Sequence, residues 1–574
     1  MTALDRPWLA VYGDYPADGV TPDLTLYELL AQSAARWPSA PAVKFLGRTI
    51  TYAELLADVD RAAAAFRSAG VGPGQTVTLV LPNIPNAIVL LYAVNQVGAR
   101  VALAHPLSSP TELRHYLNET GSTWAVTVDM FYGQVQPILD ETPVERLLVV
   151  QISDYLTHPK KLGFRVTKGR KIAPVPRSDR RLVRWREFLK SGDQAQRARR
   201  AARPGPYHRP IEPGAGAVVL FSGGTTDLPK GIELSSASFN ALGVAMGAIT
   251  GFSAGHSVLA ILPLFHGFGL GLCVHTAFAV GAHAILVPEF SADVYIDNLV
   301  KYQPSFIAGV PTLWEALLRH PRFAKVSFAQ LVGAYSGGDS LTPDLKARFD
   351  AVLQRQGATC ELVEGYGLTE CVTACVASPA GHYRTGSMGV PIPGCLVKVV
   401  APGTTDEVPF DTEGELCVTG PTLMLGYVGD PEATAATLRR HADGRVWLHT
   451  GDLGTMDADG YLYFLGRLKR LIKVSGVSVY PLQVEQVLES HPAVARACVI
   501  GIPDDYQVSR LKAFVVLEPG VPAEETTRSA ILAHCRRHLI KWAVPKAIEF
   551  RPDLPKTLVG KIAYTELERE ENAA

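Results

Sequence analysis

The sequence has no excess of either charge and no closely spaced cysteine pair. Its 55 Lys and Arg balance 55 Asp and Glu, so no overall field recruits nucleic acid. The eight cysteines include no C-x-x-C pair, and Cys371 and Cys375 have no nearby partner that would complete a metal site. We therefore expect buried, reduced thiols in a cytoplasmic protein. The first residues show no cationic segment followed by an apolar one, so we expect no secretory signal.

One long stretch lacks charge altogether. Between Leu234 and Pro288 there is no Asp, Glu, Lys or Arg, as a membrane span would show. Pro263, several glycines and four histidines interrupt this stretch. We therefore interpret it as buried helix and strand that line a core or an apolar pocket, with a membrane span as the less favoured alternative.

Positive charge is concentrated in one segment, an insert over 157–210 that is rich in Arg and Pro. Residues 160–203 include sixteen Lys or Arg and three acidic residues, a local net charge of +13. Such a run is either a solvated loop or helix face, or a surface that meets anionic phosphates. Apolar side chains interleave with the cations at Leu162, Phe164 and Val166. That arrangement suits peripheral contact with anionic lipid at the inner face of a membrane.

The chain organisation indicates an α/β protein. With 574 residues it is too long for one compact core, so we expect at least two domains. Helical periodicity runs over 51–70, opened by Thr51 and closed by Gly70, and a β-rich run at 76–81 follows. This alternation favours α/β layers with parallel strands. It continues with a helix over 86–99 and strands near 99–104, 218–221, 257–262, 284–288 and 305–310.

The pattern changes past about residue 390, where short strands alternate with Gly, Pro and Asp turns. We predict a β-rich subdomain that closes at Gly466, and then a small, mobile α+β domain. Its elements are expected near 481–490 (helix), 497–502 and 511–517 (strands), 526–540 (helix) and 547–551 (strand). The predicted domains are 1–465, a hinge at 466–470, and 471–574.

The segment LFSGGTTDLPKGIELS (220–235) carries the strongest chemical signal. A strand leads into a loop rich in Gly, Ser and Thr that ends in Lys230, and such a loop can cradle phosphate with backbone N–H groups, hydroxyls and a cation. It is not a Walker A loop, because Pro229 precedes the lysine and Gly231 follows it. Alone, the loop could be an ordinary turn.

Further motifs follow this loop in a fixed order. They are PLFHGFGL (263–270), YSGGDSL (335–341), EGYGLTE (364–370), GELCVTGPTLMLGY (414–427), HTGD (449–452), GRLKRLIKVSGVSVYP (466–481) and PKTLVGK (555–561). Together with the loop, they resemble the acyl-adenylate-forming superfamily, which includes acyl-CoA synthetases, the adenylation domains of peptide synthetases, and luciferases. The resemblance covers about residues 25–565.

The resemblance implies a role for each matched residue. Thr369 is expected to contact phosphate, Glu370 to bind Mg²⁺, and His266 to lie beside the carboxylate site. Lys561 is expected to reach the substrate carboxylate and the α-phosphate, and Lys473 to serve thioester formation after a swing about Lys469. The expected ATP contacts are Ser222, Gly223, Gly224, Thr225, Thr226 and Lys230 in the phosphate loop, Gly337, Gly338, Asp339, Glu364, Gly365 and Tyr366 around adenine, and Asp452 and Arg467 at the ribose.

The expected chemistry explains these residue types. A carboxylate that attacks the α-phosphorus needs positive charge at the developing negative oxygens, which Lys561 and Mg²⁺ would supply. No nucleophilic side chain is required, and the sequence has no G-x-S-x-G motif. The sequence departs from the family pattern at Asp227, where the phosphate loop usually has glycine. The Asp227 carboxylate either lies beside the triphosphate, where it could weaken ATP binding, or points outward.

We therefore expect an ATP-dependent acid–thiol ligase that makes an acyl-CoA through an acyl-adenylate. The basic insert resembles one found in bacterial medium- and long-chain fatty acyl-CoA synthetases, which implies a fatty acid substrate and the cofactors ATP, Mg²⁺ and coenzyme A. Three alternatives stay open: an aryl-acid CoA ligase, an adenylating enzyme that loads a carrier protein, and a non-catalytic nucleotide- or lipid-binding relative.

Overall fold

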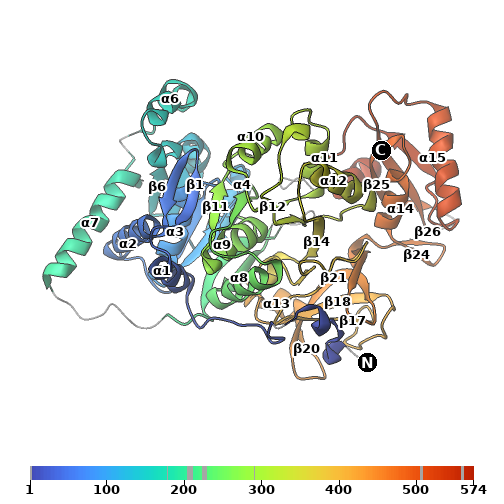
Figure 1. The fold of residues 1–574 in the computed structure, drawn as a ribbon, viewed down its shortest axis with the longest axis horizontal. Helices are drawn as coiled ribbons and strands as arrows, with labels where there is room; N and C mark the ends of the chain where they lie inside the picture. The colour runs from blue at the N-terminus through green and yellow to red at the C-terminus, as the bar shows by residue number, and fades with distance from the viewer. Residues whose placement is uncertain are drawn as a thin grey trace.

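The fold is known from a computed structural model that carries side chains. It describes residues 3–13, 15–176, 179–202, 211–222, 229–289, 291–504, 508–556 and 562–573. Figure 1 shows an elongated molecule with the helix α7 (Trp185–Ala202) at one end and the C-terminal domain at the other.

Two large sheets form most of the N-terminal part. Both are mainly parallel, as the alternating sequence pattern predicts, with antiparallel strands at their edges. The first, in spatial order, contains β16 (Val390–Pro391), β15 (Val376–Ala377), β14 (Leu362–Tyr366), β13 (Gly333–Ser336), β12 (Phe306–Gly309), β10 (Ser257–Ala260), β11 (His283–Leu286), β1 (Pro41–Phe45) and β2 (Arg48–Thr51). The second contains β19 (Gly426–Tyr427), β9 (Gly231–Ser235), β8 (Gly216–Phe221), β4 (Arg100–Leu103), β3 (Thr76–Val80), β5 (Trp124–Val128), β6 (Arg146–Val150) and β7 (Leu182–Arg184).

The helices between these sheets are apolar on almost every side. In α3 (Pro85–Gln96) every residue from Pro85 to Asn95 is buried, and α8 (Ser236–Thr250) is nearly as completely covered. A helix that is hydrophobic all round belongs in a protein core. One continuous core joins these helices to strands of both sheets. The other helices of this part are α1 (Leu26–Arg36), α2 (Tyr52–Ser68), α4 (Pro110–Glu119), α5 (Tyr132–Val135), α9 (Thr276–Val280), α10 (Ala292–Tyr302), α11 (Pro311–Leu318) and α12 (Pro343–Arg355).

The predicted elements are confirmed, with small shifts at their ends. The helix expected over 51–70 is α2, and Thr51 caps it: its hydroxyl accepts from the Glu54 N–H, while the Glu54 carboxylate accepts from the Thr51 N–H. The charge-free stretch from Leu234 forms buried strand and helix, including α8. In the part of the chain that the structure describes, no helix is both long and apolar enough to cross a membrane.

Part of the basic insert packs against the rest of the protein, which neither interpretation of its charge predicted. Its β7 extends the second sheet, and α7 packs against α2. Phe188 is buried, with its ring 4.8 Å from that of Phe66. The short helix α6 (Lys160–Val166) has the exposed side chains of Leu162 and Val166. The apolar positions of α7 were obscured in the sequence by its many arginines.

A β-rich subdomain and a small C-terminal domain complete the fold, as predicted. The subdomain is an antiparallel sheet of β17 (Leu396–Val400), β18 (Gly414–Thr419), β21 (Val446–Met456), β20 (Leu438–Arg440) and β22 (Leu462–Arg467), with α13 (Pro431–Thr437) beside it. The C-terminal domain has its own core. It contains β23 (Ile472–Val474), β24 (Val477–Val479), α14 (Pro481–Glu489), β25 (Val494–Asp504), β26 (Val508–Leu517), α15 (Glu525–His538), β27 (Ala547–Phe550) and α16 (Tyr564–Ala573). The sequence reading missed α16 and the β23–β24 hairpin.

Candidate active site

Three of the predicted nucleotide residues form one contact group. Asp452 on β21 and Arg467 on β22 are direct cross-strand partners, with Arg467 Nε 3.3 Å from Asp452 Oδ1. The hydroxyl of Tyr366, the last residue of β14, donates to Asp452 Oδ2 at 2.7 Å. These residues therefore connect the first large sheet, which contains β14, to the β-rich subdomain. A carboxylate held by a tyrosine and an arginine is suited to accept hydrogen bonds from hydroxyls of a sugar.

The turn formed by the HTGD motif (449–452) orients the Asp452 side chain toward this group. Gly451 adopts φ +69°, a left-handed conformation that favours glycine. Its N–H donates to Glu415 Oε1 at 3.0 Å, and the Thr450 hydroxyl donates to the Leu416 carbonyl at 2.7 Å. The β18–β21 pairing shifts register at this point, and such bulges redirect side chains next to functional sites.

The segment predicted to flank adenine lies at the ends of two parallel strands. Gly337, Gly338 and Asp339 follow β13, which pairs with β14 so that Ser336 lies opposite Glu364. Glu364 Oε1 accepts from the Leu341 N–H at 3.1 Å, and burial raises the pKa of Glu364 to about 8. Ligands of open α/β sheets bind beyond the carboxyl ends of the strands. Gly365, next on β14, lies beside this position.

Glu370 sits in a tightly packed segment with strained backbone. The short helix Thr369–Cys371 ends at Val372, a buried β-branched residue at φ +67°. Such a conformation costs on the order of 1–3 kcal/mol and persists where surrounding structure imposes it, often at functional sites. Tyr427 donates to Glu370 Oε1 at 3.0 Å, and burial raises the pKa of Glu370.

The loop that carries His266 packs against this strained segment. A Cβ atom at Gly267 would lie 1.6 Å from the Val372 carbonyl oxygen, so glycine is required for the close approach. His266 Nδ1 accepts from the Phe268 N–H at 3.2 Å, at the start of a π-helical turn over Phe268–His275. Such turns are frequent at functional sites. The structure therefore places the His266 loop next to the Thr369–Val372 segment.

Lys230 lies at the edge of the same group. Its Nζ pairs with Asp430 Oδ2 at 2.9 Å and lies 5.3 Å from the centroid of the Tyr427 ring. Its N–H donates to the Ser222 hydroxyl at 3.0 Å. An exposed ion pair contributes only about 0.2–1 kcal/mol, so a phosphate could replace Asp430 at small cost. The predicted loop residues Gly223, Gly224, Thr225 and Thr226, with Asp227, lie outside the described residues.

None of the three lysines predicted to act from the hinge and the C-terminal domain is described in contact with the group of Tyr366, Asp452 and Arg467. Lys473, on β23, donates to the Ser478 hydroxyl at 2.5 Å within its own hairpin, and Lys469 is exposed. Lys561 lies outside the described residues. The chain on either side of Lys469 is anchored: Arg467 to Asp452, and Arg470 to Glu485 at 2.7 Å.

The sequence reading missed two contributors to this site. Tyr427 lies in one of the quoted motifs but was given no role, and Asp430 lies just beyond it. Their contacts depend on β19 pairing with β9, which brings residues about 200 positions apart together. No local sequence pattern reports that pairing.

Comparison with known proteins decides the family. The sequence profile of the AMP-binding enzymes matches residues 30–428, and that of the AMP-binding enzyme C-terminal domain matches 483–561. The chain belongs to the AMP-binding enzyme family. It is therefore an AMP-forming acyl-CoA synthetase, and ATP and coenzyme A are the substrates of this family.

Relatives of this AMP-binding enzyme differ in the acid named. A long-chain-fatty-acid–CoA ligase of Bacillus subtilis (strain 168) is 32% identical, over 99% of this chain and 98% of that protein. A feruloyl-CoA synthase of Amycolatopsis sp. is 31% identical, over 93% and 96%. A solved structure of an anthranilate CoA ligase in complex with anthranoyl-AMP superposes with a TM-score of 0.80, covering 97% and 98% at 23% identity, which confirms the predicted fold.

Proposed function

We propose that this AMP-binding enzyme activates a medium- or long-chain fatty acid. The observation that carries the proposal is the 32% identity, over nearly the whole length, to a long-chain-fatty-acid–CoA ligase. The charge-free stretch supports it, because the loop with His266 belongs to this stretch and leads directly into buried apolar residues such as Leu270 and Val274. An aryl acid is the second candidate, favoured by the likeness to a feruloyl-CoA synthase.

In the proposed reaction, the acid carboxylate attacks the α-phosphorus of ATP and pyrophosphate leaves. The sulfur of coenzyme A then attacks the acyl carbonyl and AMP leaves. Asp452 and Arg467 hold the ribose, Tyr366 fixes Asp452 through its hydroxyl, and Lys561 reaches the reacting oxygens. Positioning and positive charge provide most of the acceleration, since both reactants are anions.

Mg²⁺ fits the residues present. The carboxylate of Glu370 and the hydroxyl of Thr369 are hard oxygen donors, and Mg²⁺ is usually held by one or two carboxylates together with substrate phosphates. When bound, Mg²⁺ neutralises charge on the phosphate oxygens. Tyr427 keeps Glu370 oriented by donating to one of its oxygens.

The two half-reactions require different faces of the C-terminal domain. We expect this domain to turn about Lys469, which lies between the anchored residues Arg467 and Arg470. One orientation brings Lys561 to the nucleotide, and the other brings the β23–β24 hairpin with Lys473. Hinge residues of this kind absorb the backbone rotation in a few positions.

A chain-length series tests the substrate. AMP release is measured with ATP, coenzyme A and saturated acids of increasing length, alongside ferulate and benzoate. Each CH₂ that the protein buries is expected to improve kcat/KM by about 0.8 kcal/mol, roughly fourfold, until the pocket is full. A flat profile, or a preference for the aromatic acids, would remove the fatty-acid proposal. AMP release that is independent of coenzyme A but requires a carrier protein would favour the carrier-loading alternative.

We further propose that the enzyme is cytoplasmic and touches the inner face of the membrane through α6. Leu162 and Val166 are four residues apart on one face of this helix, 58% and 55% exposed, in a strongly basic segment. Phe164, by contrast, is only partly exposed and packs against the core. Exposed apolar residues among cations suit an interfacial helix.

Vesicle sedimentation tests this contact. Wild-type protein should bind vesicles with anionic lipid at low salt, and the double variant Leu162→Asn/Val166→Asn should bind at least tenfold less, since two lost side chains amount to about 2 kcal/mol or more. Val332→Asn, at an exposed valine elsewhere, is the matched control and should bind normally. Equal sedimentation with neutral and anionic vesicles would end the proposal.

A further inference from the structure

A thiol and two imidazoles meet inside the β-rich subdomain, and none of them belongs to the group of Tyr366, Asp452 and Arg467. Cys417 on β18 is the direct cross-strand partner of His449 on β21. His441 follows β20 in the turn that leads to β21, and its N–H donates to the Arg445 carbonyl at 3.0 Å. The three residues therefore come from neighbouring segments of one sheet, which fixes their backbones relative to one another.

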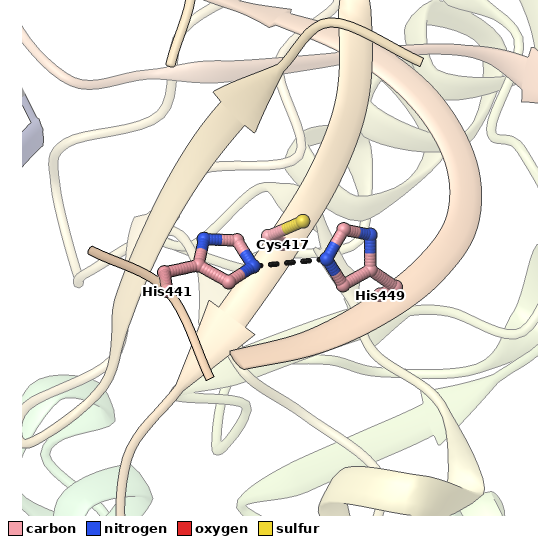
Figure 2. Close-up of side chains that lie close together, drawn as sticks. All are labelled: Cys417, His441 and His449. Atoms are coloured by element: carbon pink, nitrogen blue, oxygen red, sulfur yellow. Dashed lines mark hydrogen bonds between the residues drawn. The ribbon is translucent and has the colours of Figure 1, made fainter. Parts of the chain in front are cut away.

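The potential ligand atoms point at one another. Figure 2 shows the two imidazole rings facing each other edge to edge, with the Cys417 sulfur beside the line that joins them. His441 Nε2 and His449 Nε2 are 2.9 Å apart, and one ligand atom from each of the three residues lies within 4.8 Å of the others. All three side chains are buried. Among the described residues, this is the one such group with metal-ligand composition.

A carboxylate orients one of the imidazoles from outside the group. Glu415 Oε2 lies 3.0 Å from His449 Nδ1, and its other oxygen accepts from the Gly451 N–H. When the carboxylate accepts the Nδ1 proton, the Nε2 atom of His449 carries its lone pair toward His441 and Cys417. Metal-ligating histidines almost always make this kind of hydrogen bond through the opposite ring nitrogen.

The second imidazole, that of His441, is held in place by a neighbouring aromatic ring. Its face stacks on Trp447, with ring centroids 5.7 Å apart and planes at 30°. Without a metal, a single shared proton must lie between the two Nε2 atoms, and the thiol contributes nothing to that pair.

We propose that Cys417, His441 and His449 bind one zinc ion, with Glu415 orienting His449. Thiolate with imidazole is the donor set that zinc prefers over the hard cations. Zinc bonds of about 2.0–2.3 Å in a tetrahedral arrangement place ligand atoms about 3.3–3.6 Å apart, so the 2.9 Å nitrogen pair opens slightly and the sulfur moves in. Three protein ligands leave the fourth position to a water molecule.

Anionic groups beside the site offset most of the charge of a bound zinc ion. Zinc binding would release the thiol proton of Cys417, and the resulting thiolate and the Glu415 carboxylate together match the charge of the dication. Lys398, the cross-strand partner of Cys417, and Arg439 add positive charge nearby, and Asp443 adds one negative charge. Pairing of this kind lowers the cost of burying the ion.

The proposed zinc joins β18, β21 and the β20–β21 turn at a point three residues before Asp452. Its expected role is structural: it would hold the strand that presents the ribose carboxylate. The inference is independent of which acid the enzyme activates.

Metal analysis of the full-length protein tests the inference. Protein produced in zinc-supplemented medium and then desalted should contain one equivalent of zinc by mass spectrometry. Replacement with Co²⁺ should give the near-ultraviolet absorption of a thiolate–cobalt bond. Cys417→Ala should abolish that absorption. His441→Phe, which keeps an aromatic ring over Trp447, should lose the zinc, and added zinc should raise the melting temperature of wild type but not of this variant.

Two controls separate this site from other sources of metal binding. Cys395→Ala removes a buried cysteine outside the group and should keep both zinc and the cobalt absorption. His534→Gln disrupts a partly exposed group of three histidines on the C-terminal domain, in which the centroid of the His534 ring lies 4.2 Å from that of His538 and 5.3 Å from that of His491. The proposal would be overturned if His534→Gln lost the zinc while His441→Phe kept it. It would also be overturned if the wild-type protein held no zinc after desalting.

Discussion

Replacing Glu364 with glutamine should stabilise the protein above about pH 4.5, by an amount that grows up to about pH 8. The carboxyl lies between the ends of β13 and β14, where burial and the charge of Asp339 raise its pKa from 4.5 to about 8. Folding therefore favours the protonated form. Below about pH 4.5 the carboxyl is protonated in both the folded and unfolded states, so it carries no penalty there. The penalty grows as the pH rises to about 8 and is then constant.

The size of the effect follows from the pKa. A rise from 4.5 to about 8, at about 1.4 kcal/mol for each tenfold change in proton affinity, sets an upper limit near 5 kcal/mol. Because the Glu364 side chain is not fully covered by protein, we expect about 2–3 kcal/mol. The glutamine oxygen can still accept from the Leu341 N–H, so the variant loses no hydrogen bond.

Urea unfolding from about pH 4.5 to about pH 8, at constant ionic strength, measures the difference in free energy of unfolding. Glu364→Gln should match wild type at the acidic end and exceed it increasingly toward the basic end. Glu145→Gln, at an exposed glutamate before β6, should change the free energy by no more than about 0.5 kcal/mol throughout. Parallel curves for wild type and Glu364→Gln would refute the reasoning, because they would show that Glu364 titrates alike in both states.

Three further variants test the site. Tyr366→Phe removes a hydrogen bond to a carboxylate, worth about 1.5–3 kcal/mol, so the KM for ATP should rise about tenfold or more in an AMP-release assay; an unchanged KM would separate this hydroxyl from nucleotide binding. Lys561→Ala should slow acyl-AMP formation about 10²–10³-fold while supplied acyl-AMP still yields thioester; equal loss in both half-reactions would contradict its role. Lys469→Pro should spare adenylation and impair thioester formation, whereas an unaltered overall rate would argue against the hinge.

Much of the fold could be predicted because its signals are local. Thr51 and Glu54 cap α2 within four residues, and the alternation of periodicities predicted α/β layers with parallel strands, but not their division into two sheets. The two residues that the motifs predict at the ribose, Asp452 and Arg467, are brought together by the register of β21 with β22. The motif order, and not composition, carried the functional prediction.

Other features depend on pairing between distant segments. Tyr427 reaches Glu370 only because β19 joins the edge of the second sheet. The group of Cys417, His441 and His449 has intervals of 24 and 8 residues, which match no metal-binding spacing, and becomes visible only in the register of the antiparallel sheet. The buried face of α7 was hidden for a different reason: its arginines outnumber its apolar anchors.

The two anchored arginines that flank the proposed hinge would limit how the C-terminal domain moves. Arg467 is tied to the nucleotide side and Arg470 to Glu485, which leaves only residues 468 and 469 to absorb a reorientation. A backbone rotation confined to two residues would turn the domain as a unit and leave β22 in place. If Asp452 and Arg467 hold the ribose as proposed, their contacts can persist while the domain turns, so an unstable acyl-adenylate need not be released, or exposed to hydrolysis, between the two chemical steps.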